Sequence, residues 1–185
     1  MSKANLFQLG MDLGAGTTHA EETGLERGRV IVFRPDETIE PESGTGVAPE
    51  ALTDAAREDH FVRRDGRLYA GTHLIVEVVG GKGLDDEARI RTAFLDCIEA
   101  AGATLLHIHT HKFSPQGVSG VAVLAESHIS VHTWPEIGYG AFDIFMCGEA
   151  NPWAAIGVLQ RAFGAREVRV RELLRGEDVV TDALG

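Results

Sequence analysis

The sequence contains little cysteine and has no long apolar run. Its 185 residues include only two cysteines, Cys97 and Cys147, so a disulfide framework is not indicated and a reducing compartment fits. No stretch of about 18 apolar residues is present, which argues against a membrane-spanning helix. Gln8 and Asp12 interrupt the apolar run near the N-terminus, which makes it a poor signal peptide. These features predict a cytoplasmic protein.

Basic side chains are also scarce relative to acidic ones. The chain has 17 Lys and Arg against 28 Asp and Glu, giving a net charge of −11. Nucleic-acid phosphates and anionic membrane surfaces attract Lys and Arg, so we expect neither as a partner. An acidic chain tolerates a cationic small-molecule substrate. With 44% apolar residues, the chain can bury the core of one domain, with or without an appendage.

The composition of the chain changes near residue 70. Residues 10–66, within the first 70 residues, are rich in Gly, Glu, Asp, Arg and Pro and show little sustained periodicity. We therefore predict a partly irregular N-terminal extension, with one candidate strand at Arg29–Phe33. Residues 71–185 have regular apolar patterns and are predicted to form the folded domain.

Strand and helix patterns alternate through this second part. Apolar residues at helical spacing predict a helix from Ile90 to Ala101, with Asp85 or Asp86 as its N-cap and Gly102 as its stop. A second helix is predicted over Pro152–Phe163. The predicted strands are His73–Val79, Thr104–Phe113, Val118–Ala125, His128–Thr133, Tyr139–Cys147 and Glu167–Leu173.

This order of elements predicts an α+β fold. We expect a two-layer sandwich, with a mainly antiparallel sheet and both helices on one face. The other sheet face would then need a cover, and a second copy of the chain is the expected one. The residues expected at this contact are Ile108, Val121, Val123 and Phe142.

The richest cluster of reactive side chains lies between Glu126 and Gly148, where the sequence reads ESHISVHTWPEIGYGAFDIFMCG. Ser127 falls at the junction of two predicted strands, and its hydroxyl can attack the carbonyl of Glu126. An N-to-O acyl shift then gives an ester, and β-elimination breaks the chain. His132 is a candidate base, and Ser119 a candidate hydroxyl donor.

Four motifs in this region resemble those of bacterial-type S-adenosylmethionine decarboxylase, a pyruvoyl-dependent enzyme. They are H-x-F-x-P-x-G-V-S-G at His111–Gly120, Glu126-Ser127-His128, His132-Thr133-Trp134-Pro135-Glu136, and Cys147-Gly148. The similarity runs from Thr72 to Gly176, just over half of the chain. These motifs are long and unusual, which makes the resemblance specific.

The resemblance implies that the domain of residues 71–185 cleaves itself between Glu126 and Ser127. The proenzyme would thereby become an active lyase whose covalent pyruvoyl cofactor derives from Ser127. Ser119 and His132 would assist this processing, and His132 would also belong to the catalytic set. Cys147 would be the acid that protonates the carbanion left by loss of carbon dioxide.

The resemblance also implies a substrate, a product and an assembly. Phe113 would stack on the adenine of S-adenosylmethionine, and Glu136 would bind its ribose. The pyruvoyl group would form a Schiff base with the substrate amine, and the product would be the aminopropyl donor of spermidine synthesis. Family members pair their protomers, so we expect a homodimer or a higher assembly of cleaved chains.

Two other kinds of site are disfavoured. His107, His109 and His111 share one face of a predicted strand and, with His128 and His132, provide metal-ligand chemistry. A cupin-like metal site needs a Glu a few residues further on, which this chain lacks, so no metal is expected. A hydrolase triad of Ser127, His132 and Asp143 is disfavoured because the chain has no G-x-S-x-G elbow.

Two alternatives remain open on the sequence alone. A pyruvoyl-dependent decarboxylase of arginine or ornithine would keep the same processing residues. A non-enzymatic binding homologue would have the same fold with the bond before Ser127 intact.

Overall fold

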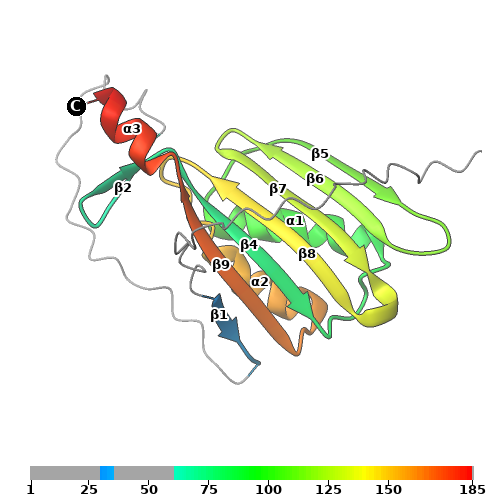
Figure 1. The fold of residues 1–185 in the computed structure, drawn as a ribbon. Coiled ribbons are helices and arrows are strands. Elements are labelled where there is room, and N and C mark those ends of the chain that lie inside the picture. Colours follow the sequence, from blue (N-terminus) through cyan, green and yellow to red (C-terminus); the bar gives the residue numbers. More distant parts are fainter. Residues whose placement is uncertain (1–29, 36–60, 185) are drawn as a thin grey trace, which may run out of the picture.

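The computed structural model describes residues 30–35 and 61–184 (Figure 1). The strands are β1 (Val30–Phe33), β2 (Val62–Arg64), β3 (Arg67–Tyr69), β4 (Gly71–Val79), β5 (Leu105–Lys112), β6 (Val118–Leu124), β7 (Ser127–Trp134), β8 (Tyr139–Met146) and β9 (Glu167–Arg175). The helices are α1 (Glu87–Ala101), α2 (Ala154–Phe163) and α3 (Glu177–Leu184), with a short 3₁₀ turn, η2 (Pro135–Ile137).

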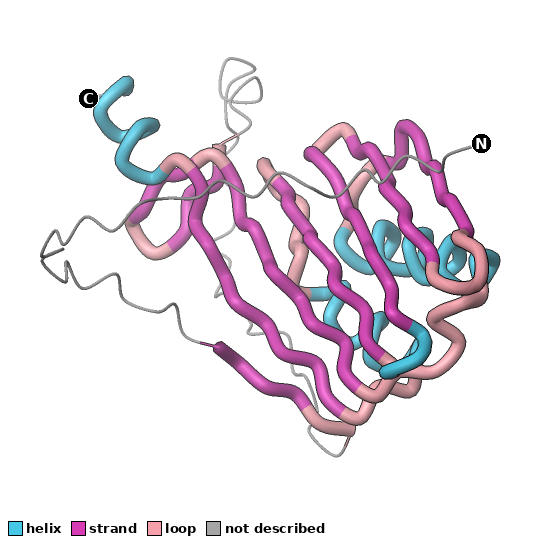
Figure 2. The backbone as a smooth tube through the Cα atoms, turned by 45° about the vertical axis from the view of Figure 1, so that its right-hand side comes forward, coloured by secondary structure: helices cyan, strands magenta, loops and turns pink. Residues whose placement is uncertain are grey.

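Seven strands form one antiparallel sheet in the order β1-β9-β4-β8-β7-β6-β5. Helices α1 and α2 cover one face of this sheet and lie behind it in Figure 1. Figure 2 shows the same two layers from the side on which the β5 edge comes forward. The predicted α+β two-layer architecture is confirmed. The candidate strand near Arg29–Phe33 is also present, as the edge strand β1.

The core lies between the sheet and the two helices. Side chains alternate along the strands, so that Leu74, Val76 and Val78 of β4 are buried on the helix side. From the opposite layer, α1 contributes a buried stripe at helical spacing, made of Ile90, Ala93, Phe94, Cys97, Ile98 and Ala101. This stripe is the one that the sequence predicts.

The ends of α1 follow from local chemistry. The Asp86 side chain accepts a hydrogen bond from the Arg89 amide, and this satisfies one N–H of the first turn. Gly102 ends the helix in the left-handed conformation, where glycine is favoured. Helix α2 begins two residues later than the expected Pro152 and ends at Phe163, before Gly164.

The open face of the sheet differs from the expected contact surface. Val121 and Val123 lie on this face, but Phe142 is buried on the helix side and Ile108 packs against the same core. The assignment of Ile108 and Phe142 to the open face was therefore wrong. Alternation fixes which residues share a face, but it does not identify the face that the helices cover.

A small unit at one end of the sheet was missed by the sequence patterns. The hairpin β2–β3 packs beside α3, and the Arg67 guanidinium pairs with the Glu177 carboxylate. Arg64 donates to Glu172 of β9 at 2.7 Å. This unit flanks the start of β4 and the end of β9 (Figure 1). Over the described ranges, none of the helices is long and apolar enough to cross a membrane.

Candidate active site

The junction of β6 and β7 contains the peptide bond that the sequence marks for cleavage. Leu124 pairs with Ser127 across a tight turn made of Ala125 and Glu126. Ser127 has a φ of 135°, a region that residues other than glycine rarely adopt. The backbone is therefore strained at the proposed nucleophile.

Glu126 is held at both its carbonyl and its carboxylate. The main-chain N–H of Cys147 donates to the Glu126 carbonyl oxygen at 2.9 Å. The main-chain N–H of Thr104 donates to Glu126 Oε2 at 2.8 Å. The carbonyl that Ser127 would attack is thus already polarised by a hydrogen-bond donor, as an oxyanion hole requires.

Cys147 directly follows β8, whose last residue Met146 pairs with Ser127. This register puts the cysteine beside the cleavage junction. Burial, reinforced by the nearby Glu126 charge, raises the pKa of the half-buried Cys147 thiol. The group therefore retains its proton at neutral pH, as a proton donor needs to.

A second cluster forms where β6 and β7 pair at their other end. Ser119 and His132 are cross-strand partners, and Ser119 Oγ lies 2.6 Å from His132 Nδ1. The His132 ring also lies near Trp134, with 6.4 Å between the ring centroids. This serine–histidine pair can exchange a proton with a third group placed above it.

Beside this pair lies a hollow of about 340 Å³. Phe113 presents an aromatic side chain that is 47% exposed. Gln116 Nε2 donates to Glu136 Oε2 at 3.0 Å, so the carboxylate is oriented while its other oxygen stays available. The lining residues are Phe113, Pro115, Gln116, Gly117, Val118, Ser119, His132, Thr133, Trp134 and Glu136.

The candidate residues thus form two groups at opposite ends of β7. Ser127 begins the strand, and His132 follows five residues later near its other end. Five residues of extended chain span about 16 Å. His132 therefore does not reach Ser127 of its own chain, although the sequence had placed the two close together.

The structure also places the residues of the alternative sites. Asp143 Oδ1 lies 3.3 Å from His73 Nε2, and His132 is paired with Ser119 rather than with Asp143. The set of Ser127, His132 and Asp143 is therefore not assembled within one chain. His107, His109 and His111 lie on exposed positions of β5. Among the residues described, no group of three or more His, Cys, Asp or Glu is arranged to hold a metal ion.

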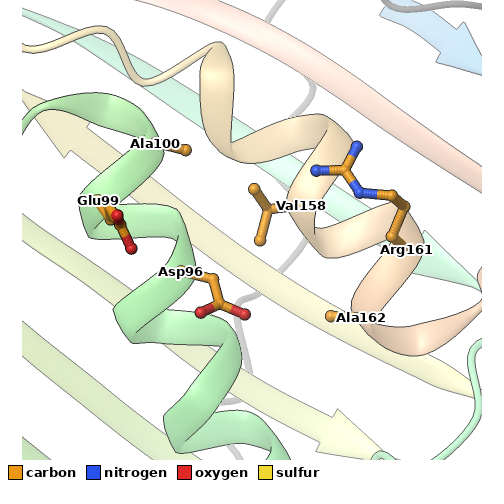
Figure 3. Close-up of a pocket in the computed structure, with 6 residues that line it drawn as sticks. All are labelled: Asp96, Glu99, Ala100, Val158, Arg161 and Ala162. Carbon is orange, nitrogen blue, oxygen red and sulfur yellow. The ribbon is translucent and has the colours of Figure 1, made fainter.

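Another hollow, of about 590 Å³, lies on the outer side of the helix layer (Figure 3). Asp96 and Glu99 of α1 face Arg161 of α2 across it. Its lining contains no serine, cysteine or histidine, so it provides no nucleophile and no acid–base pair of the kind found at the two ends of β7.

Sequence reasoning missed the main-chain donors of this site. The N–H groups of Thr104 and Cys147 donate hydrogen bonds to Glu126 because the fold brings these backbone segments together. Every residue except proline has a backbone N–H, so the residue type does not identify such a donor. Sequence reasoning also interpreted Asp85 only as a possible helix cap, whereas its side chain accepts the Gly117 N–H at 2.7 Å. In the sequence, the contact between Asp85 and Gly117 is indicated by nothing more than a second acid next to the helix cap Asp86.

Comparison with known proteins agrees with this geometry. The family model described as S-adenosylmethionine decarboxylase matches residues 72–176. A protein named S-adenosylmethionine decarboxylase proenzyme from Methanococcus maripaludis is 49% identical over 109 residues, covering 57% of this chain and 89% of the relative. One of the same name from Methanococcus aeolicus is 49% identical over 114 residues, covering 60% and 97%.

A solved structure shows the same architecture. The crystal structure of the adenosylmethionine decarboxylase from Aquifex aeolicus matches with a TM-score of 0.52 and 29% identity, covering 57% of this chain and 89% of that one. Because the family model spans more than half of the sequence and includes every candidate site residue, the chain belongs to the S-adenosylmethionine decarboxylase family.

Proposed function

We propose that this protein decarboxylates S-adenosylmethionine by means of a pyruvoyl group that it generates from Ser127. The observation that carries the proposal is the Glu126 carbonyl, which accepts the Cys147 N–H at 2.9 Å directly before a serine of φ 135°. A polarised carbonyl, a strained junction and an adjacent hydroxyl are what chain cleavage requires.

The cleavage would proceed through the chain's own atoms. Ser127 Oγ attacks the Glu126 carbonyl carbon, and the electron pair of the C=O bond moves onto the oxygen held by the Cys147 N–H. Collapse breaks the C–N bond, and the hydroxyl proton ends on the nitrogen. Removal of the Ser127 α-proton then expels Glu126 as a carboxylate. The dehydroalanine left behind tautomerises, and water replaces its nitrogen, which leaves as ammonia.

The junction fits the group that this sequence of steps would leave. A pyruvoyl group supplies a carbonyl that holds the substrate amine and accepts the electrons released with carbon dioxide. The Cys147 thiol, protonated at neutral pH because burial raises its pKa, is positioned to deliver a proton to the substrate carbon. At this junction the Cys147 N–H and the Cys147 thiol would both act as donors.

The separation of the two clusters supports assembly with a second copy. Ser127 and Cys147 lie at one end of β7, whereas Ser119, His132 and the hollow lie at the other. A two-fold axis through the open sheet face would place the serine of one protomer against the histidine of its partner. Val123 and Trp134, more than 40% exposed on this face, would be covered by such a contact.

The hollow supports a nucleoside substrate over a simple amino acid. Phe113 and Trp134 offer exposed aromatic faces for a base or a sulfonium, and Glu136 offers a carboxylate for two ribose hydroxyls. Arginine and ornithine carry neither a base nor a ribose. The product would be the aminopropyl donor for spermidine synthesis.

Two measurements test the proposal. An intact-mass spectrum of the purified protein should show one fragment ending at Glu126 and another beginning with a pyruvoyl group. Carbon dioxide release should then be found with S-adenosylmethionine and not with arginine or ornithine. A single uncleaved mass after long incubation would favour the binding homologue. Turnover of an amino acid alone would show that the substrate had changed.

A further inference from the structure

The turn between β5 and β6 forms one wall of the nucleoside hollow. It carries Phe113 and Gln116, which both line the hollow. The Phe113 N–H donates to the Gly117 carbonyl at 2.8 Å and closes the turn. The position of Phe113 and of the Gln116 partner of Glu136 therefore depends on where Gly117 is held.

Gly117 is held by Asp85, which lies in the turn before α1. Its N–H donates to Asp85 Oδ1 at 2.7 Å, and Asp85 Oδ2 lies 3.2 Å from Lys112 Nζ, at the end of β5. One carboxylate thus contacts both ends of the turn. Gly117 is buried, so its N–H would lose its protein acceptor if this carboxylate were removed.

Asp85 is itself fixed by its two neighbours. The Leu84 side chain is 1% exposed and belongs to the core. Asp86 is the N-cap of α1. A short side chain between a buried leucine and a helix cap has little freedom to move, which is the property of a good support for a binding site.

The neighbouring contacts of the turn leave little room for Gly117 to move or to be substituted. On the β7 side, Thr133 Oγ1 accepts the Val118 N–H at 2.8 Å. Gly117 has a φ of 100°, and a Cβ there would lie 3.1 Å from the Thr133 carbonyl oxygen. Strand β5 is also bonded directly to α1, because Thr110 Oγ1 donates a hydrogen bond to Glu87 Oε1 at 2.6 Å.

We infer that Asp85 is a positioning residue for the nucleoside hollow, acting through Gly117 on the turn that carries Phe113 and Gln116. Its side chain interacts with Gly117, which lines the hollow, and with Lys112, which does not. The inference rests on the proposed function and identifies a residue that sets substrate affinity from outside the site.

Binding and turnover together test this inference. Three uncleaved proteins are compared, all carrying Ser127→Ala: one retains Asp85, one also carries Asp85→Ala and one also carries Asp85→Asn. The dissociation constant of 5′-methylthioadenosine is measured for each. Asp85→Ala should weaken binding about tenfold, because the hydrogen bond from Gly117 to a charged group is lost. This is the low end of the range for such a bond, as expected for a partly exposed carboxylate. Asp85→Asn should weaken it less, since its amide oxygen still accepts the Gly117 N–H. In cleaved protein, the same changes should raise KM more than they lower kcat.

Matched controls separate this role from general effects of charge and folding. Asp96→Ala removes one carboxylate from α1, away from the hollow of Phe113, and should leave binding unchanged. Lys112→Met keeps the Gly117 hydrogen bond and should cost less than Asp85→Ala. Equal affinity of the chains with and without the Asp85→Ala change would overturn the inference, as would an asparagine variant that is folded and as weak as the alanine variant. Should the chain that retains Asp85 bind no nucleoside, the proposed function would fail and this inference with it.

Discussion

The main-chain N–H of Cys147 donates a hydrogen bond to the carbonyl oxygen of Glu126 at 2.9 Å. The same residue therefore offers two groups to the junction, a backbone donor and a thiol. A side-chain substitution removes only the thiol, so the two roles are separable by experiment.

Cys147→Ala should cleave at a near-normal rate because the backbone donor remains. Its decarboxylation should be about a hundredfold slower or more, because the proton donor to the substrate carbon is lost. Mass spectrometry follows the first effect, and carbon dioxide release follows the second. Full turnover by the alanine variant would remove the thiol from the mechanism.

The Cys147 thiol also gives a pH dependence with a defined sign. Burial raises the pKa of this thiol, so the protonated form persists through neutral pH. Decarboxylation by cleaved protein should therefore decline only in the alkaline range, as the thiol loses its proton. Cys147→Ala should lack this alkaline limb, and an identical limb in both proteins would assign it to another group.

Ser127→Ala and Ser127→Gly form a matched pair at the strained junction. Both lack the nucleophile and should remain uncleaved. Glycine adopts a φ of 135° without the steric conflict of a Cβ, so the glycine variant should have the higher free energy of unfolding, by about 1 kcal/mol. Denaturant unfolding of the two intact chains measures the difference. Equal stabilities would show that the junction is relaxed.

Mixed assemblies test whether the site is shared between protomers. Ser127→Ala chains cannot cleave, and His132→Ala chains should cleave slowly because they lack the serine–histidine pair. Co-expression should give mixed dimers in which Ser127 of one chain faces His132 of the other. The His132→Ala chain should then be cleaved faster than when it is expressed alone. A purely monomeric protein in sedimentation, or no rescue on mixing, would refute a shared site.

Glu136→Gln tests the ribose contact. The substitution keeps the size of the side chain but replaces a charged acceptor by an amide, and Gln116 Nε2 already occupies Oε2. We expect nucleoside binding to weaken by about 1–3 kcal/mol. Calorimetry with 5′-methylthioadenosine measures this loss, and self-cleavage provides an independent check that the protein is folded.

The sequence predicts most elements of this fold because their signals are local. Helix α1 has its cap at Asp86, its apolar stripe and its stop at Gly102 within a short stretch, and all three are present. The hairpin β2–β3 and α3 were not predicted. They are short, and they are stabilised by each other through Arg67 and Glu177, which are 110 positions apart.

The candidate site shows a similar limit. Motifs identify Ser127 and His132, but they do not show that strand geometry separates the two within one chain. Ile108 and Phe142 lie on the sheet face that the helices cover. The alternation of side chains along a strand shows which residues share a face, but not which face the helices cover. The main-chain donors to Glu126 and the hydrogen bond between Asp85 and Gly117 depend on how distant segments are aligned in the fold. No single residue of the sequence indicates that alignment.

The edge strand β1 bears on how far the chain can be shortened. Val30–Phe33 pairs with Val168–Arg171 of β9, although it lies outside the family-matched residues 72–176. A chain trimmed to the matched region would leave the β9 backbone as an unpaired edge. It would also remove Arg64, which donates to Glu172 together with Trp153. Unpaired edges invite strand addition from other molecules. The trimmed chain should therefore be less soluble during expression than the longer one, even though every candidate catalytic residue is retained.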